Sequence, residues 1–255
     1  MGIDRRAIVN KDAQIGSNVT IGPFSIIGDD VFIDDRTEIG ANVYIASGTK
    51  IGKNCKIFHN AVLGTIPQDL KYENEKTTLE IGDGTIIREF CSLNKGTKHS
   101  GKTEVGKNCF LMMYVHIAHD CQIGNNVIIA NATNMAGHVE IHDYANISGL
   151  CPIHQFVKIG KHSFIGGGYR VPKDVPPYIL ASGEPLSYIG PNIVGLTRRG
   201  FSKEVISRLK EAYRIIYKMN LNVSQAVQKI KSDMEITPEI KDVLDFIEKS
   251  ERGII

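Results

Sequence analysis

The side chains best suited to chemistry in this 255-residue sequence are four of its eight histidines and one aspartate, namely His116, His119, His138, His154 and Asp120. A neutral imidazole near pH 7 can take and return a proton, which suits general acid–base catalysis. Histidine triads also bind zinc in catalytic sites, and a third interpretation is polar residues without a role. The adjacent pair His119-Asp120 favours acid–base chemistry, since a carboxylate can orient an imidazole and stabilise its charged form.

These residues are far apart in the sequence, and a six-residue repeat predicts how they come together. Aliphatic residues recur every six positions, and glycine often follows them directly. Such a period suits a short strand plus a turn, and three hexads make one triangular coil of about eighteen residues. Stacked coils would pair along parallel sheets about 4.8 Å apart. The aliphatic series is Val9, Ile15, Ile21, Ile27, Ile33, Ile39, Ile45, Ile51, Ile57 and Leu63, then Ile81, Ile87 and Leu93, then Val105, Leu111, Ile117, Ile123, Ile129, Met135, Ile141, Ile147, Ile153, Ile159, Ile165 and Val171.

All five cysteines occupy one slot of this repeat, two residues before an aliphatic position. Other members of the slot are small, such as Ala61, Thr85 and Ser163. We therefore predict that the cysteines are small core residues at a tight corner, rather than metal ligands or disulfide partners. They are Cys55, Cys91, Cys109, Cys121 and Cys151.

The repeat and its end predict two domains. Residues 1–190 would form a mainly β domain, a parallel β-helix of hexapeptide repeats interrupted by insertions at 64–78 and 94–104. Residues 191–255 would form a small α-helical domain that caps the carboxyl end of the prism. The predicted helix caps are Ser202 for the first helix, Asn222 or Ser224 for the second, and Thr237, followed by Pro238, for the third.

Counting around the coil places the histidines. When a residue number is divided by eighteen, the remainder gives the position of the residue around the coil. The two insertions together add one full coil, so remainders before and after them can be compared. Both insertions leave the same corner, one coil apart, and His116, His119, His138 and His154 fall at that corner. His142 and His162 fall elsewhere, and we predict that these two, with His59 and His99, are solvated surface or loop residues.

Composition narrows the class of protein. Charged residues make up 23% of the chain and the net charge is +2, which argues against nucleic-acid binding, because that requires a strong basic excess. No window approaches the about 20 apolar residues of a membrane span. The amino terminus also lacks an apolar stretch of signal-peptide length. We expect a soluble, cytoplasmic protein that binds no nucleic acid and does not insert stably into a membrane.

Five short segments resemble the family of bacterial UDP-N-acetylglucosamine O-acyltransferases, the first acyltransferase of lipid A synthesis. The resemblance runs from the first hexad to the last helix. Hexads alone are shared by many acyl- and acetyltransferases, whereas these segments together with a carboxyl-terminal helical domain are not. The segments are His116-Ile117-Ala118-His119-Asp120-Cys121, Gln68-Asp69-Leu70-Lys71-Tyr72, Ala136-Gly137-His138-Val139, His154-Gln155-Phe156 and Arg198-Arg199-Gly200-Phe201.

The resemblance implies a fold, an assembly and a reaction. The fold is a left-handed β-helix, and the assembly is a homotrimer with three active sites in clefts between neighbouring prisms. The reaction transfers a (3R)-hydroxyacyl chain from acyl carrier protein to the 3-position of the glucosamine of a UDP-sugar. The resemblance implies that no metal and no bound cofactor takes part.

The resemblance also implies roles for single residues. A sugar hydroxyl is a weak nucleophile, so a base must take its proton as it attacks the thioester. His119 resembles that base, with Asp120 orienting it, and the Gly137 N–H resembles the donor to the oxyanion. Gly167, within Gly166-Gly167-Gly168, resembles the position that limits acyl chain length. The implied substrate-binding residues are His116 and His138 as positioners, Asp69 and Lys71 for sugar and phosphate, Gln155, Asn192, Arg198 and Arg199 for the nucleotide, and Gln68 and His154 as further contacts.

One departure from the family leaves the acceptor open. Val194 stands where the family often carries glutamate in the nucleotide-binding segment. A related acceptor, such as the 3-amino analogue of the sugar, would give an amide product. Three other classes are alternatives: another hexapeptide acyltransferase such as the later N-acyltransferase of the pathway, which usually has an extra amino-terminal domain, a zinc hydratase, and a non-catalytic ice-binding β-helix. The last needs repeated Thr-x-Thr faces, which this sequence lacks.

Overall fold

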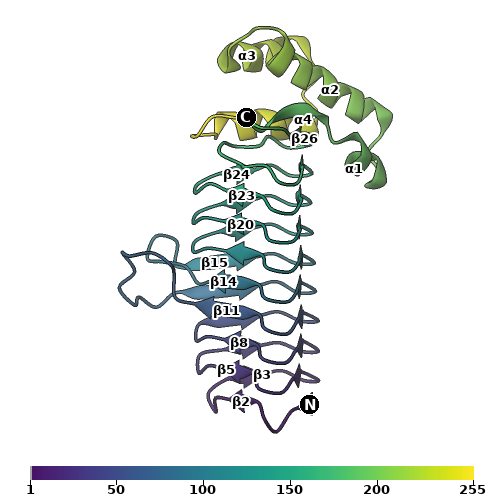
Figure 1. Ribbon diagram of the computed structural model, residues 1–255. Coiled ribbons are helices and arrows are strands. Elements are labelled where there is room, and N and C mark those ends of the chain that lie inside the picture. The colour runs from purple at the N-terminus through teal and green to yellow at the C-terminus, as the bar shows by residue number, and fades with distance from the viewer. Residues whose placement is uncertain (1) are drawn as a thin grey trace.

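Three parallel β-sheets form the walls of a long prism in the computed structural model, which describes residues 2–255 (Figure 1). From β1 to β25, consecutive strands lie on different sheets and every third strand returns to the first one, so each coil adds one strand to each wall. The strands β26 and β27 then continue the first sheet, with β27 antiparallel to β26. The helices lie together at the carboxyl end of the prism, and the amino terminus lies at the other end. The fold is a left-handed parallel β-helix with a small helical domain, as predicted.

The strands are mostly two residues long, and their order in each sheet is as follows. The first sheet contains β1 (Gly2–Ile3), β4 (Thr20–Ile21), β7 (Glu38–Ile39), β10 (Lys56–Ile57), β13 (Ile86–Ile87), β16 (Phe110–Leu111), β19 (Ile128–Ile129), β22 (Asn146–Ile147), β25 (Phe164–Ile165), β26 (Ile179–Ser182) and β27 (Ser187–Pro191). The second contains β2 (Ile8–Val9), β5 (Ile26–Ile27), β8 (Tyr44–Ile45), β11 (Val62–Thr65), β14 (Ser92–Asn94), β17 (His116–Ile117), β20 (Asn134–Met135) and β23 (Pro152–Ile153). The third contains β3 (Gln14–Ile15), β6 (Phe32–Ile33), β9 (Thr49–Ile51), β12 (Thr78–Ile81), β15 (Lys102–Val105), β18 (Gln122–Ile123), β21 (Glu140–Ile141) and β24 (Lys158–Ile159).

The predicted aliphatic series fills the interior of the prism. Ile39, Ile57 and Ile87 lie in register on three successive strands, and all three are buried. Because alternate residues of a strand face opposite sides, one inward residue per short strand is enough to build such a ladder. Val9 and Ile15 are only half-buried, since they lie near the open amino-terminal end.

The five cysteines are buried free thiols, as predicted. Burial raises the pKa of the Cys91 and Cys109 thiols to about 11. The Cys109 thiol donates to the Gly124 carbonyl oxygen of the next coil at 3.0 Å. A buried thiol with a raised pKa is a poor nucleophile, so these side chains act as packing residues.

The corners of the prism use turns whose second residue has a positive φ. At the corner between the third and first sheets this residue is often asparagine, as at Asn54 and Asn108, with φ of 56° and 54°. Asparagine tolerates the left-handed region better than most non-glycine residues. At the corner between the second and third sheets the same position holds Asp120, His138 and Phe156, with φ of 60°, 62° and 63°. These three residues therefore form a column along one corner.

Two loops leave the prism at that same corner, which we call the loop corner. Their strands pair, β11 with β14 and β12 with β15, which confirms that the loops lie one coil apart. They are shorter than the predicted insertions 64–78 and 94–104, because flanking residues continue the strands. The first loop spans residues 66–77 and the second spans 95–101, and both project from the side of the prism (Figure 1).

Four helices close the carboxyl end: α1 (Ile193–Arg198), α2 (Lys203–Lys218), α3 (Val223–Asp233) and α4 (Pro238–Glu248). Ser202 and Thr237 cap α2 and α4 as predicted, and Asn222, rather than Ser224, caps α3 in a capping box with Gln225. Leu209, Ala212 and Ile216 of α2 are buried. Helix α1 was not predicted, because six residues carry too short a periodic pattern. None of the helices within residues 2–255 has the length and apolarity to cross a membrane.

Candidate active site

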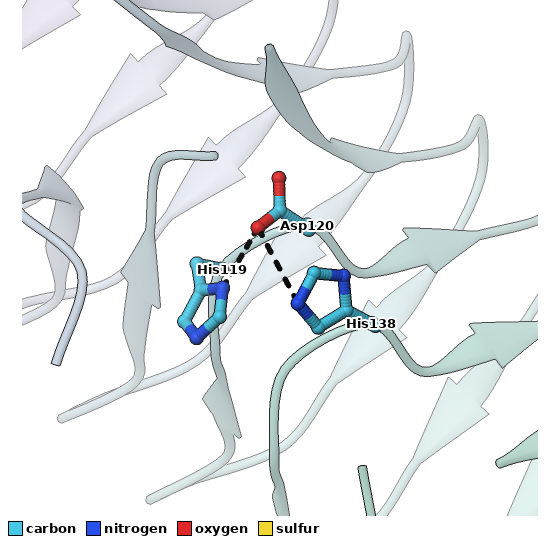
Figure 2. A group of neighbouring side chains, drawn as sticks. All are labelled: His119, Asp120 and His138. Atoms are coloured by element: carbon cyan, nitrogen blue, oxygen red, sulfur yellow. Dashed lines mark hydrogen bonds and ion pairs between the residues drawn. The ribbon is translucent and has the colours of Figure 1, made fainter. Parts of the chain in front are cut away.

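The loop corner brings His119, Asp120 and His138 together (Figure 2). His119 and Asp120 form the turn after β17, and His138 lies in the turn after β20, one coil later. The His119 Nδ1 atom is 2.8 Å from Asp120 Oδ2, and the His138 Nε2 atom is 3.9 Å from the same oxygen. The two imidazole rings stand perpendicular, with centroids 5.1 Å apart. Both histidines therefore face one carboxylate.

The Asp120 carboxylate is ionised and fixed. Its side chain has no solvent exposure. Burial opposes its ionisation, but hydrogen bonds from Ser100, His119 and Thr97 outweigh burial and hold the pKa of the carboxyl below its usual range. Since an ionised carboxylate can only accept hydrogen bonds, His119 Nδ1 must carry the proton. The lone pair of His119 Nε2 is then free to act as a base.

Gly137 makes room for the His119 ring. A Cβ atom at Gly137 would lie 2.6 Å from His119 Cε1 and 2.8 Å from Nε2, closer than packed atoms approach. Within residues 2–255 no acceptor receives the Gly137 N–H. An unpaired backbone donor beside the free nitrogen of the candidate base is suited to receive negative charge that develops on a reacting carbonyl oxygen.

His138 is held between other rings. It stacks on Phe156 with centroids 4.4 Å apart and rings 10° from parallel. Burial lowers its pKa, although the negative charge of Asp120 opposes that shift. His99, on the second loop, meets His138 edge-on at 4.7 Å. His99 is an exposed loop residue, as predicted, and the loop brings it back to the loop corner. Spacing gave no signal for it, because the loop breaks the hexad count.

The other two predicted corner histidines lie differently. His116, on β17, is half-buried, and its Nδ1 atom is 2.7 Å from the Ser92 hydroxyl. Burial lowers the His116 pKa, and the nearby His119 adds to that shift. His154 is exposed, with Nδ1 3.1 Å from the Gln155 carbonyl oxygen. In the part of the chain that the structure describes, it joins none of the ring contacts of His119 and His138.

Of the three predicted residues on the first loop, only Asp69 is near enough to His138 for its charge to act on that histidine, among residues 2–255. The negative charge of Asp69 favours the protonated form of His138 and so counters the burial that lowers the His138 pKa. Its carboxylate also accepts the Lys71 N–H at 3.0 Å, which shapes a turn. Gln68 and Lys71 are exposed. A free ammonium group and a free amide on this loop are available to a polar ligand.

The predicted nucleotide-binding segment lies at another corner, between the third and first sheets, which we call the helix corner. Asn192 is buried and caps α1: its carboxamide oxygen accepts the Gly195 N–H at 3.1 Å, and its Nδ2 donates to the His162 carbonyl oxygen at 3.0 Å. The Arg199 guanidinium lies over the Tyr144 ring at 5.2 Å, and burial lowers its pKa. Arg198 is exposed.

His162 also belongs to the helix corner, and the prediction that it is solvated was wrong. It stacks between Tyr144 and Tyr178, at 4.8 and 5.5 Å, and Phe201 meets it edge-on at 5.0 Å. Burial, together with the charge of Arg199, lowers its pKa to about 4. A side chain at this turn position is exposed unless neighbouring coils or the helical domain cover it. The periodicity of the sequence does not predict whether they do.

Zinc binding would use the same atoms as acid–base chemistry. One ligand atom from each of His119, Asp120 and His138 lies within 4.8 Å of the other two. Zinc binds nitrogen and oxygen ligands at about 2.0–2.2 Å, while both Asp120 oxygens already accept hydrogen bonds. A metal would have to displace the His119–Asp120 hydrogen bond. The donor set therefore fits a hydrogen-bonded pair better than a zinc site.

Family models match two parts of this chain. A model described as UDP N-acetylglucosamine O-acyltransferase, domain 2, matches residues 174–255. A model of bacterial transferase hexapeptide repeats matches residues 30–65 and 102–135. The two matches correspond to the helical end and to the prism.

Relatives and solved structures match nearly the whole chain. An acyl-[acyl-carrier-protein]–UDP-N-acetylglucosamine O-acyltransferase of Thiobacillus denitrificans is 46% identical over 98% of this chain and 97% of its own length. One from Sulfurihydrogenibium is 53% identical over 97% and 92%. The crystal structure of a UDP-N-acetylglucosamine acyltransferase from Bacteroides fragilis matches with a TM-score of 0.97 and 47% identity, and covers 99% of both chains. The Acinetobacter baumannii structure matches at 0.96 and 44%, also over 99% of both.

Fold, corner geometry and relatives agree on the class of protein. The molecule is an acyltransferase built on a hexapeptide-repeat β-helix. Within that class, the chain belongs to the UDP-N-acetylglucosamine O-acyltransferase family.

Proposed function

We propose that this protein transfers a (3R)-hydroxyacyl chain from acyl carrier protein to the 3-hydroxyl of the glucosamine in UDP-N-acetylglucosamine, the first step of lipid A synthesis, with His119 as general base. The observation that carries the proposal is the free Nε2 of His119, held beside the unpaired Gly137 N–H by an ionised Asp120. The names of the relatives supply the donor and the acceptor.

The reaction follows from this geometry. His119 Nε2 takes the proton of the sugar hydroxyl as its oxygen attacks the thioester carbonyl. The oxyanion of the tetrahedral intermediate accepts the Gly137 N–H. Asp120 stabilises the imidazolium that forms, as the carboxylate of a Ser–His–Asp triad does. When the carbon–sulfur bond breaks, His119 returns the proton to the departing thiolate, so the products are an ester and the free thiol of the carrier.

The remaining predicted residues divide between substrate parts. We assign His116, His138 and the loop residues Gln68, Asp69 and Lys71 to the sugar and phosphate. We assign His154, Gln155, Asn192, Arg198 and Arg199 to the nucleotide. Exposed Arg198 is the freest cation of this second group, whereas Asn192 already uses its carboxamide to cap α1. Gly167 is assigned to the acyl groove.

A homotrimer is part of the proposal. In one chain, His119 lies at the loop corner and Arg198 at the helix corner, on opposite edges of the third sheet. Sites in clefts between neighbouring prisms bring different corners of two chains together, so one substrate can meet both sets of residues. The number of buried free thiols also suits a reducing compartment, so we place the reaction in the cytoplasm.

The 3-amino analogue of the sugar is a second candidate acceptor, because Val194 has 62% of its surface exposed where the family often has glutamate. The test is mass spectrometry of products from the purified enzyme, offered both sugar nucleotides and several (3R)-hydroxyacyl carrier thioesters. An ester of UDP-N-acetylglucosamine as the main product supports the proposal. An amide as the main product would show that the 3-amino sugar is the acceptor. The absence of an acylated product from either sugar would refute the proposed reaction.

A further inference from the structure

The second loop surrounds the Asp120 carboxylate with hydrogen-bond donors. The carboxylate accepts five hydrogen bonds, and four of them come from this loop. Thr97 donates its N–H to Oδ1 at 3.0 Å and its hydroxyl to Oδ2 at 2.7 Å. Ser100 donates its N–H to Oδ1 at 3.3 Å and its hydroxyl to the same oxygen. The fifth donor is His119 Nδ1.

This arrangement leaves Asp120 only one orientation. The Asp120 N–H donates to the Thr103 hydroxyl at 2.8 Å, which fixes the backbone of the turn. Rotation of the carboxylate would break the bonds from Thr97 and Ser100 together, and a buried carboxylate without its donors is costly. Oδ2 therefore stays directed at His119, and His119 stays in the orientation that leaves Nε2 free.

We propose that Thr97 and Ser100 are positioning residues for acyl transfer, because their hydroxyls lock the Asp120 carboxylate that orients His119. This inference rests on the proposed function, since it concerns the same base. Neither residue is expected to touch the substrate through its hydroxyl, because the Thr97 hydroxyl is directed at Asp120 and the Ser100 hydroxyl lies between Asp120 Oδ1 and the Lys102 carbonyl oxygen, 2.8 Å from the latter. Their contribution should therefore be to the rate of the chemical step and not to substrate binding.

Anchoring the loop does not require these bonds. The Thr77 hydroxyl donates to the Gly96 carbonyl oxygen at 2.6 Å, and the Gly96 N–H donates to the Thr78 carbonyl oxygen at 3.1 Å. At the other end, the Thr78 N–H donates to the Gly101 carbonyl oxygen at 3.0 Å. The loop is thus held to the prism at both ends without Asp120, and the bonds to the carboxylate are additional.

The test compares Thr97→Val and Ser100→Ala, which remove one hydroxyl each, with Thr77→Val, which removes a hydroxyl that anchors the same loop without touching Asp120. We expect kcat to fall about tenfold in each of the first two variants, with both Michaelis constants within about twofold of wild type. Thr97→Ser keeps the hydroxyl and should restore kcat. Thr77→Val should lower the melting temperature but leave kcat within about twofold.

Wild-type kcat in both Thr97→Val and Ser100→Ala would overturn the inference, as would an equal loss in Thr77→Val. A crystal structure of the Thr97→Val/Ser100→Ala protein gives a readout that does not depend on turnover. The Asp120 carboxylate should be rotated away from His119, and an unchanged Asp120–His119 pair would contradict the inference. An inactive wild-type protein would refute the proposed function instead, and the crystal structure would still decide the role of the loop.

Discussion

His138 and His162 occupy the same position of the turn at two corners, with φ of 62° and 57°, and yet they belong to different kinds of site. At the loop corner, His138 faces an ionised carboxylate and a second imidazole, His119. At the helix corner, His162 lies between Tyr144 and Tyr178, and its Nδ1 atom is buried without a hydrogen-bond partner among residues 2–255. The repeat determines the backbone position of such a histidine, and the neighbouring residues determine whether it is suited to catalysis.

The difference comes from what covers each corner. The second loop supplies hydroxyl and amide donors to the loop corner, and these stabilise the negative charge of the Asp120 carboxylate. The helical domain covers the helix corner with Phe201 and Arg199, an aromatic ring and a cation. A protonated His162 would meet burial and a like charge, so this histidine stays neutral near pH 7.

Among the changes that leave both histidines in place, the largest effect is expected from filling the space beside His119 at the loop corner. In Gly137→Ala the added methyl group would collide with the His119 ring, and displacement of a catalytic group by about 1 Å can cost on the order of 10²-fold in rate. We expect kcat to fall by about that factor, with an unchanged circular dichroism spectrum. Gly190→Ala is the matched control, because a Cβ at Gly190 meets no atom within 4 Å. Wild-type turnover in Gly137→Ala would show that His119 need not lie where the structure places it.

A smaller, selective effect is expected at Gly167, which lies at neither the loop corner nor the helix corner. A Cβ there would be 3.3 Å from the Gly149 carbonyl oxygen, so a methionine would extend along the exposed surface that we assign to the acyl chain. We expect Gly167→Met to shift the ratio of kcat/KM for short and long donors about tenfold toward short chains, consistent with the effect of several methylene groups. Competition between carrier thioesters of different length measures this ratio. An unchanged preference among donors would mean that the acyl groove lies elsewhere.

A change of a few fold is expected at the exposed lysines of helix α2. From Arg198 to Lys218 the sequence has seven basic and two acidic residues. Arg208 and Arg214 are paired with Glu235 and Glu211 at 2.8 Å, whereas Lys203, Lys210 and Lys218 are exposed, with no ion pair among residues 2–255. The family resemblance implies an acidic acyl carrier protein, and we propose that these three lysines dock it.

Reversal of Lys203, Lys210 and Lys218 to glutamate should raise the Michaelis constant of the carrier protein about three- to tenfold, because charges at a rim act mainly on association. Added salt should raise the wild-type constant, since the Debye length is only about 8 Å at physiological ionic strength. Lys11→Glu, at the far end of the prism, is the control. A carrier-protein constant that responds neither to salt nor to the triple reversal would place docking on another surface.

The smallest effect is expected at the helix corner, where the titration of His162 should change the stability of the protein. The pKa of His162 falls from 6.5 to about 4 on folding, so between these values the unfolded chain binds a proton that the folded chain does not. Stability should therefore fall as pH drops from about 6.5 to 4. His162→Phe keeps the stacking and removes this titration, so its melting temperature relative to wild type should rise steadily from pH 7 to pH 4. A difference that stays constant with pH would mean that folding does not lower the pKa of His162.

The sequence predicted the prism in detail because the six-residue period leaves few alternatives. Every cysteine was placed correctly in the core by its slot in the repeat. The meeting of His119, Asp120 and His138 followed from the same count and is confirmed. His162 was misjudged, because the helical domain that covers it lies outside the periodic part. The contact of His99 with His138 had no signal in the spacing, because the second loop also lies outside the periodic part. The role of Thr97 and Ser100 had no sequence signal, since hydrogen bonds across 20 and more residues depend on how the loop folds back.

We infer that the residues of the loop corner catalyse acyl transfer and that His162 at the helix corner does not. The most direct measurement is kcat for acyl transfer in His119→Ala and His162→Phe, assayed side by side with wild type, with the assembly of each variant checked by light scattering. We predict a loss of about 10²–10⁴-fold for His119→Ala, as expected for a missing general base, and activity within about twofold of wild type for His162→Phe, with both proteins intact. Activity of His119→Ala above about half of the wild-type value, with an intact assembly, would show that His119 is not the general base.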